Sequence, residues 1–260
     1  MKHITSRDNP QLKHLHGLAR SGRERRKSGE TLLDGAHLLA AALDAGVVPT
    51  TLVVSESAQH KAENANLLER GGGAKLICLP DALFAHVSPV DTPSGLLGVI
   101  RMPPPVMPGA LSGSVLLLEG VQDAGNLGTM LRTAAAAGIG FALLTEGCAQ
   151  AWSPKVLRAG MGAHFGMEIF EHVDVGEMVS RFAGKILATS LGDGAGLLYE
   201  QDLSGPVMWM FGAEGAGLSA AAQALATVRV RIPMPGEMES LNVAAAAAIC
   251  LFEQVRQQNG

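Results

Sequence analysis

Short apolar runs alternate with helical segments along the second half of the chain. Short, largely apolar runs predict strands at 114–118, 141–144, 186–190, 207–211 and 228–232. Helices are predicted at 127–137, 154–159 and 241–256. Continuously apolar strands separated by helices predict a parallel α/β sheet that is covered on both faces.

The first half alternates in shorter elements. Helices are predicted at 9–20 and 36–45, and strands at 51–55, 75–79 and 96–100. In the first helix, Leu12, Leu15 and Leu18 recur on one side. This pattern predicts a small α/β domain over residues 1–101.

A proline-rich segment separates the two halves. Residues 102–109 read MPPPVMPG, with four prolines in eight positions. Such a segment cannot continue a helix or a central strand. We therefore predict a linker over residues 102–113 and a second domain over residues 114–260.

Composition narrows the class of protein. The 260 residues are 47% hydrophobic and 17% charged, as is typical of globular chains. The longest apolar run, 243–252, is well short of the roughly 20 residues of a membrane span, and the N-terminus has no apolar signal core. Cys78, Cys148 and Cys250 lie far apart without a CxxC pair, which argues against a disulfide framework and a zinc finger. We expect a cytoplasmic protein without a membrane segment or a metal site.

Charge is unevenly distributed. The formal net charge is −4, but residues 1–30 hold eight Lys and Arg against three Asp and Glu, a net +5 that leaves −9 for the remainder. The densest part comprises Arg23, Arg25, Arg26 and Lys27. Such a cluster favours a polyanion contact, with a solvated basic helix as the alternative.

Three loops after predicted strands could border one site, because ligands of parallel sheets bind beyond the carboxyl ends of the strands. In the first loop, Asn126 is expected to cap the next helix, and Gly125 and Gly128 allow close approach. Arg132 then offers a planar fork suited to phosphate or carboxylate. The alternative is a capped helix with a surface arginine.

The other two loops are also unusual. Residues 212–217 contain three glycines and Glu214, the only charge between Asp202 and Arg229. The third loop leads from prolines into a helix whose N-terminus offers Ser240 and Asn242. The alternative for the second loop is a plain glycine turn before a helix capped by Ser219. The alternative for the third loop is that Ser240 is a simple N-cap. Neither GxGxxG nor a Walker A lysine is present, which argues against a dinucleotide-dependent dehydrogenase.

Together the loops resemble, in order, the three motifs of the SpoU/TrmH family of RNA ribose 2′-O-methyltransferases, in the SPOUT superfamily. The matching residues are Asn126, Gly128 and Arg132, then Gly212, Glu214 and Gly217, then Ile232, Pro233, Met234, Ser240, Leu241 and Asn242. Ala213 departs from the Asn that is common in the family. Residues 1–101 are similar to the family's substrate-binding domain in segments 6–10, 33–35 and 94–98.

The resemblance implies a deep trefoil knot in the second domain, a homodimer and bound S-adenosylmethionine. It implies a cofactor pocket lined by Thr189, Ser190, Leu191, Gly192, Gly212, Ala213, Glu214, Ile232, Pro233, Met234 and Leu241. It also implies methyl transfer to a ribose 2′-hydroxyl in structured RNA, with rRNA favoured over tRNA. An inert RNA-binding or ribosome-assembly factor on the same fold is the alternative.

The resemblance also assigns roles to side chains. Arg132 is the residue that acts on the ribose, and we expect it to grip phosphate and stabilise developing alkoxide, because a guanidinium stays protonated. Asn126 and Glu214 position it or the ribose, and Ser240 and Asn242 shape the opposite wall. The RNA backbone is expected to contact Arg20, Arg23, Arg25, Arg26 and Lys27.

Overall fold

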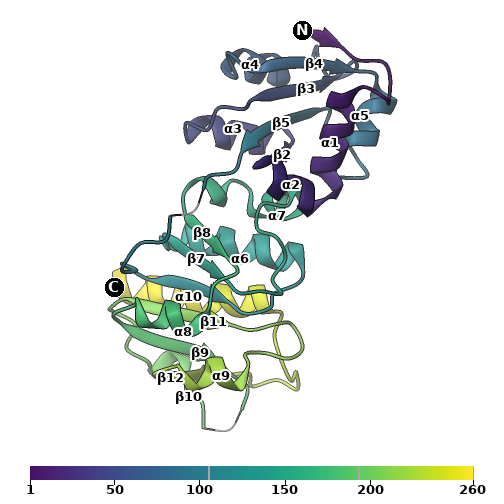
Figure 1. The fold of residues 1–260 in the computed structure, drawn as a ribbon. Helices are drawn as coiled ribbons and strands as arrows, with labels where there is room; N and C mark the ends of the chain where they lie inside the picture. Colours follow the sequence, from purple (N-terminus) through teal and green to yellow (C-terminus); the bar gives the residue numbers. More distant parts are fainter. Residues whose placement is uncertain (105, 193, 260) are drawn as a thin grey trace. The chain divides into compact units, whose positions relative to one another are not determined.

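The chain folds as two compact units, which the computed structural model describes over residues 1–104, 106–192 and 194–259 (Figure 1). The N-terminal unit comprises Met1–Pro104 and Trp152–Phe165, and the C-terminal unit comprises Pro105–Ala151 and Gly166–Gly260. Position 105 of the predicted linker lies outside the described residues. No described helix is long and apolar enough to cross a membrane.

The N-terminal unit is built on a mixed five-stranded sheet in the order β1-β4-β3-β5-β2. Strand β5 runs antiparallel to β2 and β3, while β4 pairs in parallel with β1 and β3. The three predicted strands and two predicted helices are present, whereas strands β1 and β2 and the helices α2, α4 and α5 were not predicted. The elements are β1 (Lys2–His3), α1 (Pro10–Arg20), α2 (Gly22–Ser28), β2 (Glu30–Asp34), α3 (Ala36–Asp44), β3 (Thr51–Ser55), α4 (Ala62–Arg70), β4 (Lys75–Leu79), α5 (Asp81–Val87) and β5 (Leu96–Arg101).

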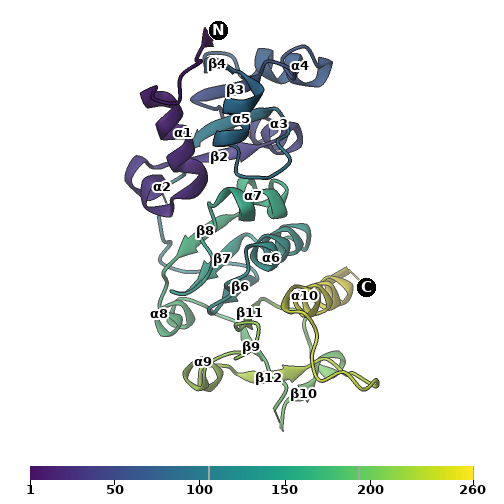
Figure 2. The ribbon, with the colours of Figure 1, turned by 90° about the vertical axis from the view of Figure 1, so that its right-hand side faces the viewer.

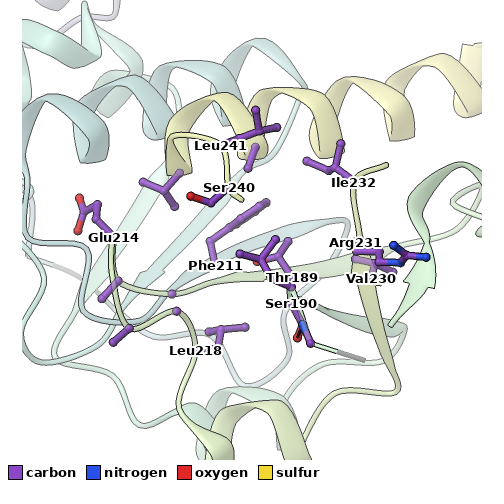
Figure 3. Close-up of a pocket in the computed structure, with 18 of the residues that line it drawn as sticks. Thr189, Ser190, Phe211, Glu214, Leu218, Val230, Arg231, Ile232, Ser240 and Leu241 are labelled. Atoms are coloured by element: carbon purple, nitrogen blue, oxygen red, sulfur yellow. Dashed lines mark hydrogen bonds between the residues drawn. The ribbon is translucent and has the colours of Figure 1, made fainter. Parts of the chain in front are cut away.

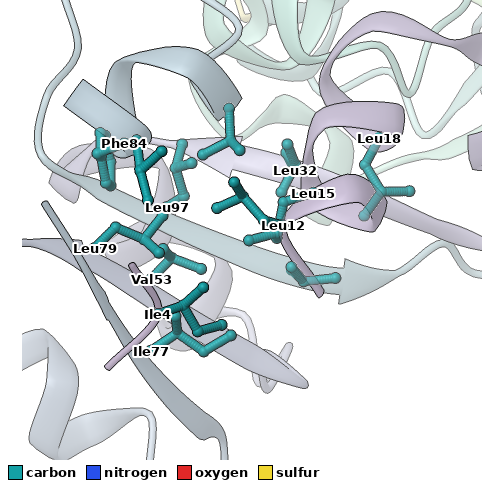
Figure 4. Close-up of a cluster of buried hydrophobic side chains, with 13 residues drawn as sticks. Ile4, Leu12, Leu15, Leu18, Leu32, Val53, Ile77, Leu79, Phe84 and Leu97 are labelled. Carbon is teal, nitrogen blue, oxygen red and sulfur yellow. The ribbon is translucent and has the colours of Figure 1, made fainter. Parts of the chain in front are cut away.

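Helix α1 covers one face of this sheet. It begins at Pro10, after Asn9, whose side chain accepts from the backbone N–H of Gln11. Its leucines, at 2% exposure or less, enter a core with residues of β3, β4, β5 and α5 (Figure 4). The apolar spacing predicted from the sequence is therefore the spacing that anchors α1.

Residues Trp152–Phe165, which hold α7 (Pro154–Gly160) and η1 (Ala163–Phe165), pack with the N-terminal unit. The Thr31 hydroxyl donates to the Trp152 carbonyl at 2.7 Å, and Arg158 pairs with Asp34 at 2.9 Å. Burial raises the pKa of Asp34, against the opposing effects of Ser94 and Arg158. The sequence division placed this segment in the second domain, because pairing to β2 leaves no local pattern.

The C-terminal unit contains a seven-stranded sheet in the order β10-β12-β9-β11-β6-β7-β8, and every pair is parallel, which confirms the predicted fold class. Figure 2 shows α6 and α10 on one face and α8 and α9 on the other. The elements are β6 (Val115–Leu118), α6 (Ala124–Ala136), β7 (Phe141–Leu144), β8 (Glu168–Glu171), α8 (Val175–Ser180), β9 (Lys185–Thr189), β10 (Gly196–Leu197), η2 (Leu198–Glu200), β11 (Val207–Phe211), α9 (Ala220–Ala224), β12 (Val228–Arg231) and α10 (Val243–Asn259).

The strand order positions the site. Strand β9 lies between β11 and β12, and β11 also pairs with β6. All these strands are parallel, so the loops that follow them leave from the same edge of the sheet. The fully buried Trp209 of β11 donates its indole N–H to Gln254 of α10 at 2.8 Å, which ties the central strand to the closing helix.

Candidate functional site

A cavity of about 690 Å³ opens beyond the ends of β9, β11 and β12. The loops after these three strands form its walls, together with the first turns of α10 (Figure 3). A volume of this size is typical of pockets that bind a small-molecule ligand.

The residues that the resemblance places around a cofactor gather in this cavity, with one exception. Pro233 is not among the residues that line it. The lining includes Thr189, Ser190, Leu191, Gly192, Gly212, Ala213, Glu214, Ile232, Met234 and Leu241.

Gly212 is required by the path of the backbone. A Cβ at this position would lie 2.0 Å from the carbonyl carbon of Gly217 and 2.1 Å from the nitrogen of Leu218. The loop turns back on itself here, through a bridge between Ala213 and Gly217, and Gly217 has a φ of 67°. Only glycine allows two backbone segments to approach so closely. The resulting loop presents backbone to the cavity.

Glu214 is held by the first loop. Its carboxylate accepts the Asn126 side-chain amide at 3.0 Å and the backbone N–H groups of Gln122 and Asp123 at 3.3 Å each. Burial acts to raise the pKa of Glu214, but these hydrogen bonds outweigh it and lower the pKa below its ordinary value. Glu214 is therefore an ionised acceptor at neutral pH, already engaged with the loop that precedes Arg132.

The expectation that Asn126 caps a helix is wrong. Helix α6 begins earlier, at Ala124, and its N-cap is Asp123, whose side chain accepts from the Asn126 N–H at 2.7 Å. A carboxylate is a good acceptor at the positive end of a helix. The Asn126 side chain is thereby released to bridge other loops.

That bridge extends to the third loop. The Asn126 carbonyl oxygen accepts from the Asn242 amide at 3.0 Å. The Asn242 carbonyl oxygen in turn accepts from the N–H groups of Ala244 and Ala245, at the start of α10. Asn242 is therefore the N-cap of α10, a role that the sequence alternative gave to Ser240. One chain of hydrogen bonds joins all three loops.

A second carboxylate, which the sequence reasoning missed, joins the first and second loops. Glu119 accepts from the Ser219 N–H at 2.7 Å and from its hydroxyl at 2.8 Å. Ser219 also caps α9, as the sequence alternative anticipated. The signal for Glu119 was its place directly after a buried strand.

Arg132 lies on the exposed side of α6, two turns beyond its N-cap, and is not a lining residue of the cavity. Over the described residues, no hydrogen bond or ion pair engages its side chain. Ser240 is exposed and does line the cavity. The site therefore combines a pocket, a fixed polar network and a nearby guanidinium that is free to bind an anion.

Several lining residues were not predicted. Phe211 forms part of the wall, and Arg229 and Arg231 line the cavity from β12. The two arginines alternate with the buried Val230 directly before Ile232. Period-two alternation was the available signal.

The predicted basic arm is divided by the fold. Arg23, Arg26 and Lys27 are exposed on α2, and Arg20 is exposed while donating to the Ser88 carbonyl at 3.3 Å. Arg25 is buried and donates to the Leu18 carbonyl at 2.8 Å. Its assignment as a phosphate contact is therefore corrected, because its guanidinium faces the interior of the unit.

Within the described ranges, no three His, Cys, Asp or Glu side chains cluster as a metal site.

Residues 113–252 match the model of the SpoU rRNA methylase family, and residues 9–98 match the MRM3-like substrate-binding domain.

Relatives and solved structures cover almost the whole chain. The 23S rRNA (guanosine(2553)-2′-O)-methyltransferase RlmP of Bacillus subtilis is 33% identical over 97% of this chain and 98% of its own. An AdoMet-bound rRNA methyltransferase from Sinorhizobium meliloti has a TM-score of 0.84 at 28% identity, over 98% of this chain and 97% of its own. An RNA 2′-O ribose methyltransferase has a TM-score of 0.82 at 32% identity, over 99% of this chain and 100% of its own. The family model, the relative and the solved structures all match, and the fold and the three joined loops agree with them. The chain therefore belongs to the SpoU rRNA methylase family.

Proposed function

We propose that this protein transfers a methyl group from S-adenosylmethionine to a ribose 2′-hydroxyl of rRNA. The observation that carries the proposal is the cavity beyond β9, β11 and β12, together with the hydrogen-bonded chain from Glu214 through Asn126 to Asn242, which joins the loops after β11, β6 and β12. A fixed polar network beside a pocket is what orientation of a weak nucleophile requires.

The lining residues fit the cofactor. Phe211, Leu218 and Ile232 supply apolar wall, and the close turn at Gly212 brings backbone polar groups to the cavity. Glu214 lines the cavity while its carboxylate is held by Asn126 of the first loop, and its negative charge favours a cationic ligand (Figure 3). When bound, S-adenosylmethionine supplies an electrophilic methyl group.

The side chains divide the remaining work. Arg132 binds an RNA phosphate beside the target ribose and stabilises the charge that develops on the 2′-oxygen. It stays protonated, so the hydroxyl proton leaves to phosphate or water. Asn126, Glu214 and Asn242 are positioning residues, because their hydrogen-bonding groups already engage one another and the loop backbone.

Ribosomal RNA is favoured over tRNA by the extent of the likenesses. The relatives that cover nearly the whole chain include proteins named for rRNA. A structure described for 2′-OH methylation of C/U34 on tRNA covers 56% of this chain. The N-terminal unit, with Arg23, Arg26 and Lys27 exposed on α2, supplies phosphate contacts in the proposed complex.

We also propose a homodimer, formed through α10. This helix exposes Ala245 and Phe252 on one side, with the half-buried Ile249 between them, and Phe252 is 47% exposed. The spacing of these residues forms one apolar stripe on the helix. A second copy of the chain would bury the stripe, and sedimentation of wild type against Phe252→Glu tests this. The trefoil knot and the cytoplasmic location stay predictions.

The test is an assay that contains the protein, methyl-labelled S-adenosylmethionine and one RNA at a time: unmodified 23S rRNA, 16S rRNA or bulk tRNA. Label that maps to a ribose of one rRNA is the expected result. Label in tRNA alone would identify tRNA, in place of rRNA, as the substrate class. No transfer to naked RNA or to ribosomal particles, together with no cofactor binding, would leave the inert RNA-binding factor instead.

A further inference from the structure

The C-terminal unit carries an adverse charge for an RNA enzyme. Its sequence holds six Lys and Arg against fourteen Asp and Glu, a net charge of −8. An RNA backbone that approaches the cavity therefore meets long-range repulsion. Local cations at the mouth of the site have to overcome it.

Three of the six cations are already neutralised by acids. Arg181 pairs with Glu177 at 2.6 Å, Lys185 with Asp202 at 3.0 Å, and Arg256 with Glu253 at 2.8 Å. The other three are Arg132, Arg229 and Arg231, and none of them has an ion pair within the part of the chain that the structure describes. Among the described residues of this unit, the cations without an acid partner are therefore Arg132 on α6 and the two arginines at the cavity.

Arg229 and Arg231 lie on the same side of β12. Both are exposed, while Val230 between them is 1% exposed. The neighbouring strand β10 places Gly196 opposite Val230 and Leu197 opposite Arg231. A Cβ on Gly194 would lie 3.6 Å from a terminal nitrogen of Arg229, so glycine backbone borders that guanidinium. Figure 3 shows Arg231 at the rim, across the cavity from Glu214.

We propose that Arg229 and Arg231 form an RNA phosphate subsite at the rim of the cavity. This inference rests on the proposed function, since it assumes that RNA reaches the cavity. Two guanidinium groups two residues apart on one strand face offer adjacent planar forks to anionic oxygens. A strand of RNA held there would lie across the mouth of the pocket.

The test compares two double variants with equal loss of charge. Arg229→Gln with Arg231→Gln removes the proposed subsite, and Lys185→Gln with Arg256→Gln removes two cations that already pair with acids. Binding of a 23S rRNA transcript is measured from low to high salt, and S-adenosylmethionine binding is measured by calorimetry. Circular dichroism verifies folding of each variant.

The subsite variant is expected to bind RNA roughly tenfold more weakly. Its slope of log Kd against log salt should be shallower by about 1.5, from two lost phosphate contacts. Its cofactor affinity should change much less than its RNA affinity, and the control variant should lose much less RNA affinity. Arg229→Lys with Arg231→Lys should restore part of the binding.

Two results would overturn the proposal. Equal losses in the two double variants would mean that net charge alone matters. A weaker cofactor affinity with unchanged RNA binding would assign the pair to the carboxylate of the cofactor. If wild type transfers no methyl group yet binds RNA in an arginine-dependent way, the proposed function fails and the subsite stands.

Discussion

The two units of this chain differ in how they can bind a polyanion. The N-terminal unit holds fourteen Lys and Arg against ten Asp and Glu, whereas the C-terminal unit is at −8. The first has exposed cations in excess on α2, so several can contribute to RNA affinity interchangeably. In the second, few cations lack an acid partner among the described residues, so each of these should have a separate effect. RNA affinity is therefore expected to be shared among several cations in the N-terminal unit, whereas single arginines of the C-terminal unit should have distinct effects on binding and on chemistry.

The strongest test of that division is Arg132→Ala. We expect kcat to fall on the order of 10²–10³-fold or more, because a charge-stabilising donor at the reacting oxygen is lost. S-adenosylmethionine affinity should stay near wild type, since Arg132 is not a lining residue. Single-turnover assays and calorimetry measure the two quantities. Unchanged turnover would remove Arg132 from the proposed chemistry.

Gly212→Ala is expected to disrupt the site of the C-terminal unit by displacing its backbone. The added Cβ would overlap the backbone of Gly217 and Leu218, which cannot move away cheaply. We expect loss of cofactor binding and a lower Tm. Gly215→Ala is the matched control, because a Cβ there meets nothing within 4 Å. Equal behaviour of the two variants would contradict the close turn.

Removal of positive charge from α2 tests the contribution of the N-terminal unit to RNA affinity. The triple change Arg23→Gln, Arg26→Gln and Lys27→Gln should weaken RNA binding and flatten its salt slope by about 2. The value of kcat at saturating RNA should not change. Filter binding across salt concentrations, with initial rates, measures both. A fall in kcat without a change in RNA affinity would contradict the proposed division.

Arg25→Ala should behave differently from its neighbours. This side chain is buried and donates to the Leu18 carbonyl, so its removal leaves that acceptor and the surrounding packing unsatisfied. We expect a loss of about 1–3 kcal/mol in the free energy of unfolding. Urea denaturation measures it. A fully stable Arg25→Ala protein with weakened RNA binding would return Arg25 to the phosphate-binding group.

The smallest predicted effect concerns pH. The folded pKa of Glu214 is lowered, so its hydrogen bonds contribute stability that is present above the unfolded value of about 4.5 and is lost as pH falls below it. Glu214→Gln should lower Tm at pH 7, and the difference should shrink as pH falls from about 5 to about 3. Thermal melts across this range measure it, and a constant difference would contradict the role of the ionised carboxylate.

Most of the fold could be predicted because its signals are local. Apolar runs marked five of the seven strands of the parallel sheet, all except β8 and β10, and Leu12, Leu15 and Leu18 marked the buried side of α1. The segment Trp152–Phe165 escaped prediction because its assignment depends on contacts with Thr31 and Asp34, more than a hundred residues earlier. The same limit applied to Arg25, whose neighbours in sequence are all exposed or half-buried.

The sequence by itself determined the fold class, the three loops and many, though not all, of the residues that gather around the cavity. Local pattern and motif spacing are enough for these, since they depend on residue type and order. Only the tertiary structure decided that Asp123 caps α6, that Asn126 links Glu214 to Asn242, and that Arg229 and Arg231 are left without an acid partner among the described residues. These outcomes depend on which side chains meet across the sheet edge, and distance in sequence carries no record of those meetings.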